Sequence, residues 1–396
     1  MDVDEQYATA VFQRLDGDPG PSTVDIGRAV ADGERHHRRV RLAGSTAVAA
    51  VAAAVAAIVV TSWTVTGVDR RENRPPAAQP TVTEVPTKGP LACSVEQLAT
   101  PSGQGPKAVV SGADPTGRYI VGRTYPGGKP STVIWVDRQP QQAPMPGDDP
   151  VLRDITSTGV AVGTSFVGDK TAAWIYADRR YTRLAGGGAE ANAINERRMI
   201  VGAVGNKPAV WRSANSQPTM LALPGPGWSG MALDVDEDGT VVGSLAKGSG
   251  DRVAAAWRPD GTLRQLPAPT AHGGPANDYT AESIRNGWVS GWAAFDRDQI
   301  RYIGGPRWNL NTGAVENIDG FFESVNQQGW TVGSATLVTD DQTLQLPAPH
   351  GFEMGPQILA YTLSDDGSTI AGQVGTRNGD VRNQPIAVIW TCKRSG

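Results

Sequence analysis

The 396-residue chain is poor in the side chains on which most catalytic and metal sites depend. It contains four histidines and two cysteines, and two of the histidines, His36 and His37, lie in a basic cluster near the N-terminus. Neither a nucleophile elbow nor a phosphate-binding loop occurs in a convincing context. The sequence therefore predicts a protein that is not an enzyme and that has no catalytic residues, cofactor or metal.

An excess of one charge is also lacking. Lysine and arginine number 36 and aspartate and glutamate 40, which gives a formal net charge of -4. Proteins that bind nucleic acid through phosphate contacts usually carry a strongly basic face. The near balance predicts no nucleic-acid partner and no other polyanionic partner.

Glycine, in contrast, is abundant, with 48 residues, and seven of them end copies of one stretch. Its clearest copy, residues 233–243, reads Leu-Asp-Val-Asp-Glu-Asp-Gly-Thr-Val-Val-Gly. The final glycines recur at intervals of 39 to 48 residues and are Gly122, Gly163, Gly202, Gly243, Gly291, Gly333 and Gly372. Strand-rich repeats of this length are typical of β-propellers. The predicted fold is all-β, a seven-bladed β-propeller.

Each unit reads as four short strands. In the fourth unit we expect strands at residues 231–235, 240–244, 253–257 and 262–266, with a turn at 236–239. Tryptophan is expected to end the third strand and fill the space between blades in six units, at Trp135, Trp174, Trp211, Trp257, Trp308 and Trp390. The sixth unit lacks this tryptophan, which leaves open whether that blade has three or four strands.

The seventh unit stops before its fourth strand, and the missing strand is found at the other end of the domain. Residues 96–101 resemble residues 264–269, so we expect residues 92–99 to cross over and complete the last blade. Strand exchange of this kind closes the ring and removes two free sheet edges. Both cysteines, Cys93 and Cys392, fall on this seam. A disulfide between them is predicted, and two unrelated buried thiols are the alternative.

The units resemble the HAF-type extracellular repeats. The family pattern, Asp-Ile-Asn followed by Gly-x-Val-Val-Gly and a later aromatic-Trp strand, is approximated by residues 232–257, and the resemblance covers residues 107–392. It implies a secreted or surface-displayed repeat domain on a bacterial membrane anchor, and no specific chemistry.

The first ninety residues predict a membrane anchor. Residues 42–68 carry no charge, and this segment is long enough for a single transmembrane helix. A basic cluster at residues 35–41 predicts that the N-terminus lies in the cytoplasm. Residues 69–90 form a proline-rich extracellular stalk, and residues 91–396 form the propeller outside the cell membrane. A cleaved signal peptide is the rival interpretation.

Residues 1–41 are predicted to be a cytoplasmic tail. Acidic residues precede a short apolar stripe, which is compatible with a helix that docks a cytosolic partner, and a disordered tail is the alternative.

Two groups of candidate ligands remain open from the sequence. His272 and His350 both follow a Leu-Pro-Ala-Pro stretch between units. They are either functional residues or exposed loop residues. Asp234, Asp236 and Asp238 begin like a calcium loop, but the twelfth position is Leu245 and other units replace Asp234, which favours a turn.

We therefore expect a membrane-anchored extracellular propeller that acts as a binding or sensing module for an unknown protein or glycan ligand. Its binding surface is expected in the variable loops at residues 124–131, 267–278, 295–306 and 375–385. Two alternatives are a cell-surface hydrolase or lyase with a site at the propeller axis, and a tail that docks a regulatory protein in transmembrane signalling.

Overall fold

The structure is a computed structural model that describes residues 91–297, 300–352, 356–376 and 385–394. The predicted tail at 1–41, transmembrane helix at 42–68 and stalk at 69–90 lie outside the described residues. Within the described part of the chain, no helix is long and apolar enough to cross a membrane.

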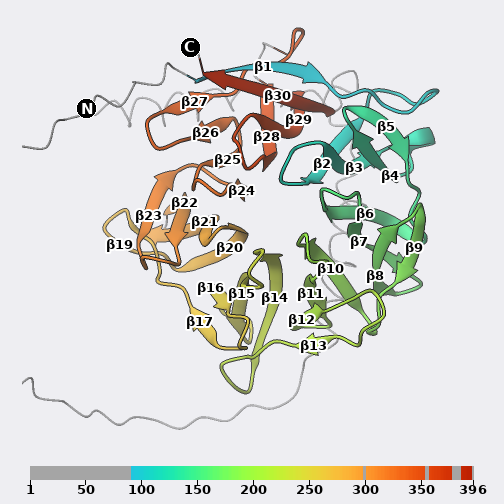
Figure 1. The fold of residues 1–396 in the computed structure, drawn as a ribbon. Helices are drawn as coiled ribbons and strands as arrows, with labels where there is room; N and C mark the ends of the chain where they lie inside the picture. The colour runs from blue at the N-terminus through green and yellow to red at the C-terminus, as the bar shows by residue number, and fades with distance from the viewer. Residues whose placement is uncertain (1–90, 298–299, 353–355, 377–384, 395–396) are drawn as a thin grey trace, which may run out of the picture. The chain divides into compact units, whose positions relative to one another are not determined.

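Seven four-stranded antiparallel sheets surround a common axis, as the sequence repeats predict (Figure 1). The first four blades are β2 to β5 (Ala108–Ala113, Tyr119–Thr124, Ser131–Val136, Gln139–Gln142), β6 to β9 (Asp148–Ile155, Ala161–Val167, Lys170–Ala177, Arg180–Arg183), β10 to β13 (Ala189–Ile194, Ile200–Val204, Lys207–Trp211, Thr219–Met220) and β14 to β17 (Trp228–Val235, Val241–Lys247, Arg252–Trp257, Leu263–Gln265).

The other three blades include the seam of the ring. They are β20 to β23 (Asp278–Arg285, Trp288–Arg297, Ile300–Asn309, Val315–Asp319), β24 to β27 (Ser324–Val325, Thr331–Gly333, Thr336–Val338, Thr343–Gln345) and β28, β29, β30 and β1 (Pro356–Leu363, Thr369–Thr376, Ile386–Arg394, Leu91–Gln97). A small hairpin, β18 and β19 (Thr270–Ala271, Gly274–Pro275), precedes the fifth blade.

The ring closes as the sequence predicts. Strand β1 pairs with β30 along its whole length, and Cys93 lies opposite Cys392 in this ladder. The two residues form a disulfide, with 4.0 Å between their Cα atoms. The last blade is thus built from both ends of the propeller, which Figure 1 shows as a blue strand beside a red one.

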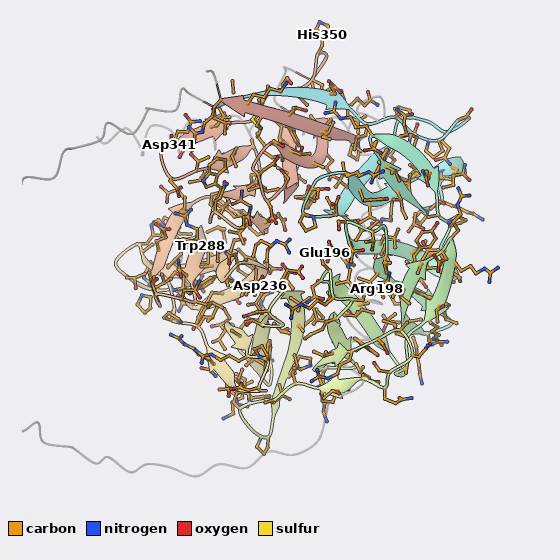
Figure 2. The ribbon with its side chains drawn as sticks, in the orientation of Figure 1. Glu196, Arg198, Asp236, Trp288, Asp341 and His350 are labelled. Carbon is orange, nitrogen blue, oxygen red and sulfur yellow. A yellow bond between two sulfur atoms is a disulfide. The ribbon has the colours of Figure 1, made fainter. Side chains whose placement is uncertain are left out.

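The first strand of every blade lies next to the axis, and the turn that follows it points to one end of the ring. Figure 2 shows Glu196 and Asp236, from two of these turns, near the centre of the ring. Six of the first strands contain a β-bulge near the end that leads into this turn, for example between Ala232 and Asp234 in β14. A bulge leaves one extra residue without a ladder partner and redirects its side chain.

The bulges explain the repeated glycines. A Cβ atom on Gly243 would lie 2.0 Å from the carbonyl oxygen of Met231, which the bulge brings close to the neighbouring strand. All seven repeat glycines face a backbone carbonyl in this way, at 1.9 to 2.2 Å from the position of a Cβ atom. Only glycine allows this approach of two backbones.

Five of the six predicted tryptophans fill the space between blades. Each is almost fully buried and donates an indole N–H hydrogen bond to a carbonyl group of the preceding blade; they are Trp135, Trp211, Trp257, Trp308 and Trp390. The prediction that Trp174 ends the third strand is wrong, because this residue pairs with Gly163 and donates to Ser165. Trp174 is half-buried and still packs against core residues of the first and second blades. Tyr176 stands at the register position where the other blades have tryptophan.

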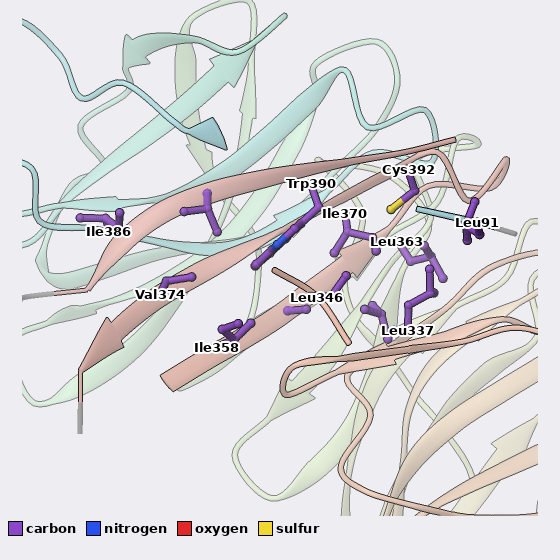
Figure 3. Packing of buried hydrophobic residues seen from close by; sticks show 13 residues of the cluster. Leu91, Leu337, Leu346, Ile358, Leu363, Ile370, Val374, Ile386, Trp390 and Cys392 are labelled. Atoms are coloured by element: carbon purple, nitrogen blue, oxygen red, sulfur yellow. The ribbon is translucent and has the colours of Figure 1, made fainter. Parts of the chain in front are cut away.

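The sixth blade has four strands, which resolves the question left open by the sequence. Its strands have only two or three residues each, because the chain between Gly333 and Leu346 is short. Val338 stands where other blades have tryptophan. Its inner residues, Leu337 and Leu346, pack with Trp390 and the core of the last blade (Figure 3).

Candidate functional site

A narrow channel of about 270 Å³ runs along the axis and is lined by the first strands of all seven blades. The extra residues of the bulges line it, with Glu323 at the matching place in the sixth blade, and these are Ser111, Arg153, Asn192, Leu233, Glu282, Glu323 and Tyr361. The bulges therefore direct side chains from six separate repeats into one channel, and all of these side chains except that of Leu233 are polar.

Two carboxyl groups are buried in the channel wall. Asp154 accepts backbone hydrogen bonds from Ile155 and Ile194, both at 2.8 Å, and Asp234 accepts them from Val235 and Ile284 at 2.7 and 2.8 Å. Burial raises the pKa of Asp154 to about 8, and the charge of Asp234 adds to that shift. Burial also raises the pKa of Asp234 to about 6. Each carboxyl group ties its own blade to the next one.

Two glutamates, Glu282 and Glu323, also line this channel. Burial raises the pKa of Glu323 to about 7, and the nearby charge of Glu282 adds to the shift. Glu282 accepts a hydrogen bond from the hydroxyl group of Thr280 at 2.5 Å. Burial lowers the pKa of Arg153, and the charge of Glu190 opposes that change.

Arg285 closes the end of the channel where the turns meet. Its Nε and Nη2 atoms donate to the two carboxylate oxygens of Asp365, at 2.9 and 3.0 Å, and its Nη1 donates to Glu237 at 3.1 Å. Arg285 therefore joins the fourth, fifth and seventh blades. The ion pairs raise its pKa despite burial.

Further hydrogen bonds continue this connection around the ring. Glu196 accepts from the backbone and the hydroxyl group of Ser157, both at 2.7 Å, and its own backbone N–H donates to Glu237 at 3.1 Å. On the other side, the backbone N–H of Asp365 donates to Pro115 at 2.8 Å. The polar turn residues at this end thus hold blades together.

A hollow of about 710 Å³ lies on the face that carries these turns. It is bounded by the turn after β10, both turns of the fourth blade and both turns of the fifth blade. Four arginines line it: Arg197, Arg258, Arg264 and Arg285. We call this hollow the arginine groove. The sequence did not indicate this groove, because its variable loops predicted a binding surface on the opposite face.

The candidate calcium residues take separate structural roles. Asp234 binds backbone amides inside the channel, as described above. Asp236 accepts from Glu237, Asn286 and Gly287 at 2.8, 3.1 and 2.8 Å, and Asp238 accepts from the backbone of Thr240 at 2.7 Å. Within the described ranges, no group of three acidic, histidine or cysteine side chains converges to hold a metal ion.

The two candidate histidines do not form one site. His272 stacks on Tyr302, with ring centroids 4.2 Å apart, and also contacts Phe295. His350 is exposed at the tip of a loop at the outer edge of the ring (Figure 2). His272 belongs to the β18–β19 hairpin beside the fifth blade, away from that loop (Figure 1).

No family model matches the sequence. No curated protein matches it either.

Several solved structures resemble the fold. The β-propeller domain of the Trilobed protease from Pyrococcus furiosus is 10% identical, with a TM-score of 0.48 over 73% of this chain and 97% of that one. The putative TolB from Agrobacterium tumefaciens is 11% identical, with a TM-score of 0.30 over 77% and 98% of the two chains. An oligogalacturonate lyase in complex with manganese is 10% identical, with a TM-score of 0.35 over 77% and 98%. At these values the likeness concerns the propeller fold and carries no argument about activity.

Proposed function

We propose that this protein is a membrane-anchored binding or sensing module, with the propeller outside the cell and no catalytic activity of its own. The proposal includes the HAF-type character of the repeats, residues 42–68 as the single transmembrane helix and residues 1–41 in the cytoplasm.

One observation carries the non-catalytic part of the proposal. The turn-side carboxylates that approach the axis are engaged in bonds between blades, because Asp154 and Asp234 accept backbone amides and Glu237 and Asp365 hold Arg285. Carboxylates used in this way stabilise the ring and are not free to take part in acid or base chemistry. The exposed hollow of the arginine groove offers binding surface instead.

The disulfide supports the placement of the propeller outside the cell. Disulfides form and persist in oxidising compartments and are rare in the cytosol. Cys93 and Cys392 are bonded, and the described residues contain no free cysteine. Carbonate extraction of membranes tests the anchor, because deletion of residues 42–68 should release the chain into the soluble fraction. Release of the unaltered chain by carbonate would reject the anchor.

A glycan and peptide array tests the binding role. We expect the full-length chain in detergent micelles to be retained on a specific ligand, with no change in that ligand. Turnover without retention would favour the enzyme and reject the proposal.

A hydrolase or lyase at the axis is the second candidate, and Glu323 is the observation that favours it. The pKa of this side chain is raised to about 7, a value suited to a general acid near neutral pH. Glu282 lies close enough for its charge to contribute, so the two could divide the acid and base roles. Loss of turnover in Glu323→Gln, with a bell-shaped pH profile in the unaltered protein, would support this candidate.

A further inference from the structure

We propose that the arginine groove is a binding site for a ligand that carries several carboxylate or phosphate groups. This inference rests on the binding role proposed above and specifies the class of ligand. It begins from three guanidinium groups, those of Arg197, Arg258 and Arg264.

These arginines come from different parts of the ring and meet only in the folded protein. Arg197 lies in the turn between β10 and β11, whereas Arg258 and Arg264 stand on either side of the turn between β16 and β17. All three side chains are exposed. Among the residues that the structure describes, none of the three guanidinium groups forms an ion pair or donates a hydrogen bond to a carboxylate. Guanidinium groups bind carboxylate and phosphate oxygens through paired hydrogen bonds, so these three side chains suit a ligand that carries oxyanions.

The groove lining also contains four acidic residues, and the carboxylates of these residues are hydrogen-bonded to groups other than the three guanidinium groups. The carboxylate of Asp236 accepts three backbone N–H groups and is 6% exposed. Glu237 and Asp365 are both bound to Arg285. Asp238 accepts from the backbone and the hydroxyl group of Thr240. The guanidinium groups of Arg197, Arg258 and Arg264 therefore remain available to bind oxygen atoms of a ligand.

The size of the groove favours an extended ligand over a single small ion. Its volume of about 710 Å³ falls within the range of roughly 300 to 1,000 Å³ that is usual for ligand pockets. Asn311 and Gln327 also line it and can hydrogen-bond to hydroxyl groups of a ligand. An oligomeric ligand with repeated acidic groups matches the separate arginines better than inorganic phosphate does.

The floor of the groove is preorganised. The backbone N–H groups of Asn286 and Gly287 both bind Asp236, and the side chain of Asn286 donates to Gln327 at 3.3 Å. Arg285 holds the neighbouring turns in place through its ion pairs with Glu237 and Asp365. Preorganised sites lose less conformational entropy when a ligand binds. The net charge of the chain does not reveal this site, because the four arginines of the groove lining are matched in number by four acidic residues.

Isothermal titration calorimetry of the full-length chain tests the site with three probes. Trigalacturonate supplies carboxylates, tripolyphosphate supplies phosphates, and maltotriose is the neutral control. We expect at least one acidic probe to bind, maltotriose not to bind, and affinity to fall as ionic strength rises. Arg258→Gln and Arg264→Gln should each weaken binding at least tenfold.

Arg212→Gln is a matched control for the surface charge. Arg212 follows Trp211 as Arg258 follows Trp257, and it is exposed, but it does not line the groove. We expect this variant to bind as the unaltered protein does. Thermal unfolding of all three variants checks that they fold.

The outcomes separate the site from the wider proposal. Binding of trigalacturonate alone assigns an acidic glycan, and binding of tripolyphosphate alone assigns a phosphate-bearing ligand; both support the site. Failure of both acidic probes at millimolar concentration, or an equal loss in Arg212→Gln, would overturn it. Array retention that persists in Arg258→Gln would reject the groove but keep the binding role.

Discussion

The carbonyl oxygen of Met231 lies 2.0 Å from the place where a Cβ atom on Gly243 would stand. The same approach exists in all seven blades, and in six of them the repeated glycine lies opposite a bulge. The glycine that defines the repeat in the sequence is thus the residue that allows the bulge, and the bulge directs a side chain into the channel.

Replacing Gly243 by alanine should destabilise the propeller. The added methyl group would overlap backbone that cannot move without breaking the ladder between β14 and β15, and we expect a loss of about 3 kcal/mol in the free energy of unfolding. Urea unfolding measures this loss. Gly187→Ala is the control, because a Cβ atom there meets nothing within 4 Å. Equal stability of the two variants would contradict the proposed role of the glycine.

The disulfide should contribute strongly to the stability of the ring. Cys93 and Cys392 are 299 residues apart in sequence, and closing so long a loop is worth about 5 kcal/mol in chain-entropy terms. The double variant Cys93→Ser, Cys392→Ser should therefore unfold at lower urea concentration than the unaltered protein, and reductant should have no further effect on it. Peptide mapping without reductant that recovers both cysteines as free thiols would disprove the bond.

Loss of Arg285 should loosen the contact between three blades. Arg285→Met leaves the carboxylates of Asp365 and Glu237 without their cation, and we expect a loss of about 2 kcal/mol, reduced from the fully buried case because the pair is partly exposed. Arg118→Met is the control, since Arg118 and Asp137 are 53% and 65% exposed. If both variants keep the stability of the unaltered protein, Arg285 does not join the blades as described.

Stability should fall as pH rises from about 4 to about 8. An ordinary aspartate has a pKa near 4, whereas Asp154 and Asp234 have pKa values of about 8 and 6 in the folded protein. Between pH 4 and 8 the folded state keeps the proton on these carboxyl groups, whereas the unfolded state has lost it. The free energy of unfolding therefore falls as pH rises through this range, and the fall ends above about pH 8.

Variants at these positions isolate the effect. Asp154→Asn removes a titrating group, so the slope of unfolding free energy against pH should become shallower between pH 4 and 8. Asp178→Asn, in an exposed turn, should leave the slope as it is. A steeper slope in Asp154→Asn, or no difference from the unaltered protein, would contradict the raised pKa.

The ring and its seam could be predicted from the sequence because each depends on a local pattern. The spacing of Gly243 and its equivalents gives the number of blades, and residues 96–101 resemble the fourth strand of another unit. The register of Trp174 could not be predicted, since a tryptophan two positions earlier still satisfies the alternating pattern of a strand. The number of strands in the sixth blade stayed open because Val338 stands where other blades have tryptophan and so lacks the aromatic signal.

The arginine groove and the acidic channel could not be predicted for a different reason. Arg197 and Arg264 lie in different repeats, and only the curvature of the ring brings their turns to one place. Asp154 and Asp234 also lie in different repeats, and their charges interact only because both residues line the axial channel. The arginine that follows the tryptophan in Trp211-Arg212 and Trp257-Arg258 is a weak signal that a comparison of repeats could have used.

Recovery of the bound ligand is the most direct test of the binding role. The full-length chain is incubated with the ligand that it retains on the array, the complex is isolated, and the ligand is eluted and weighed by mass spectrometry. The binding module predicts a ligand of unchanged mass that is retained by the unaltered protein. A shortened or eliminated product, formed in proportion to incubation time, would contradict it.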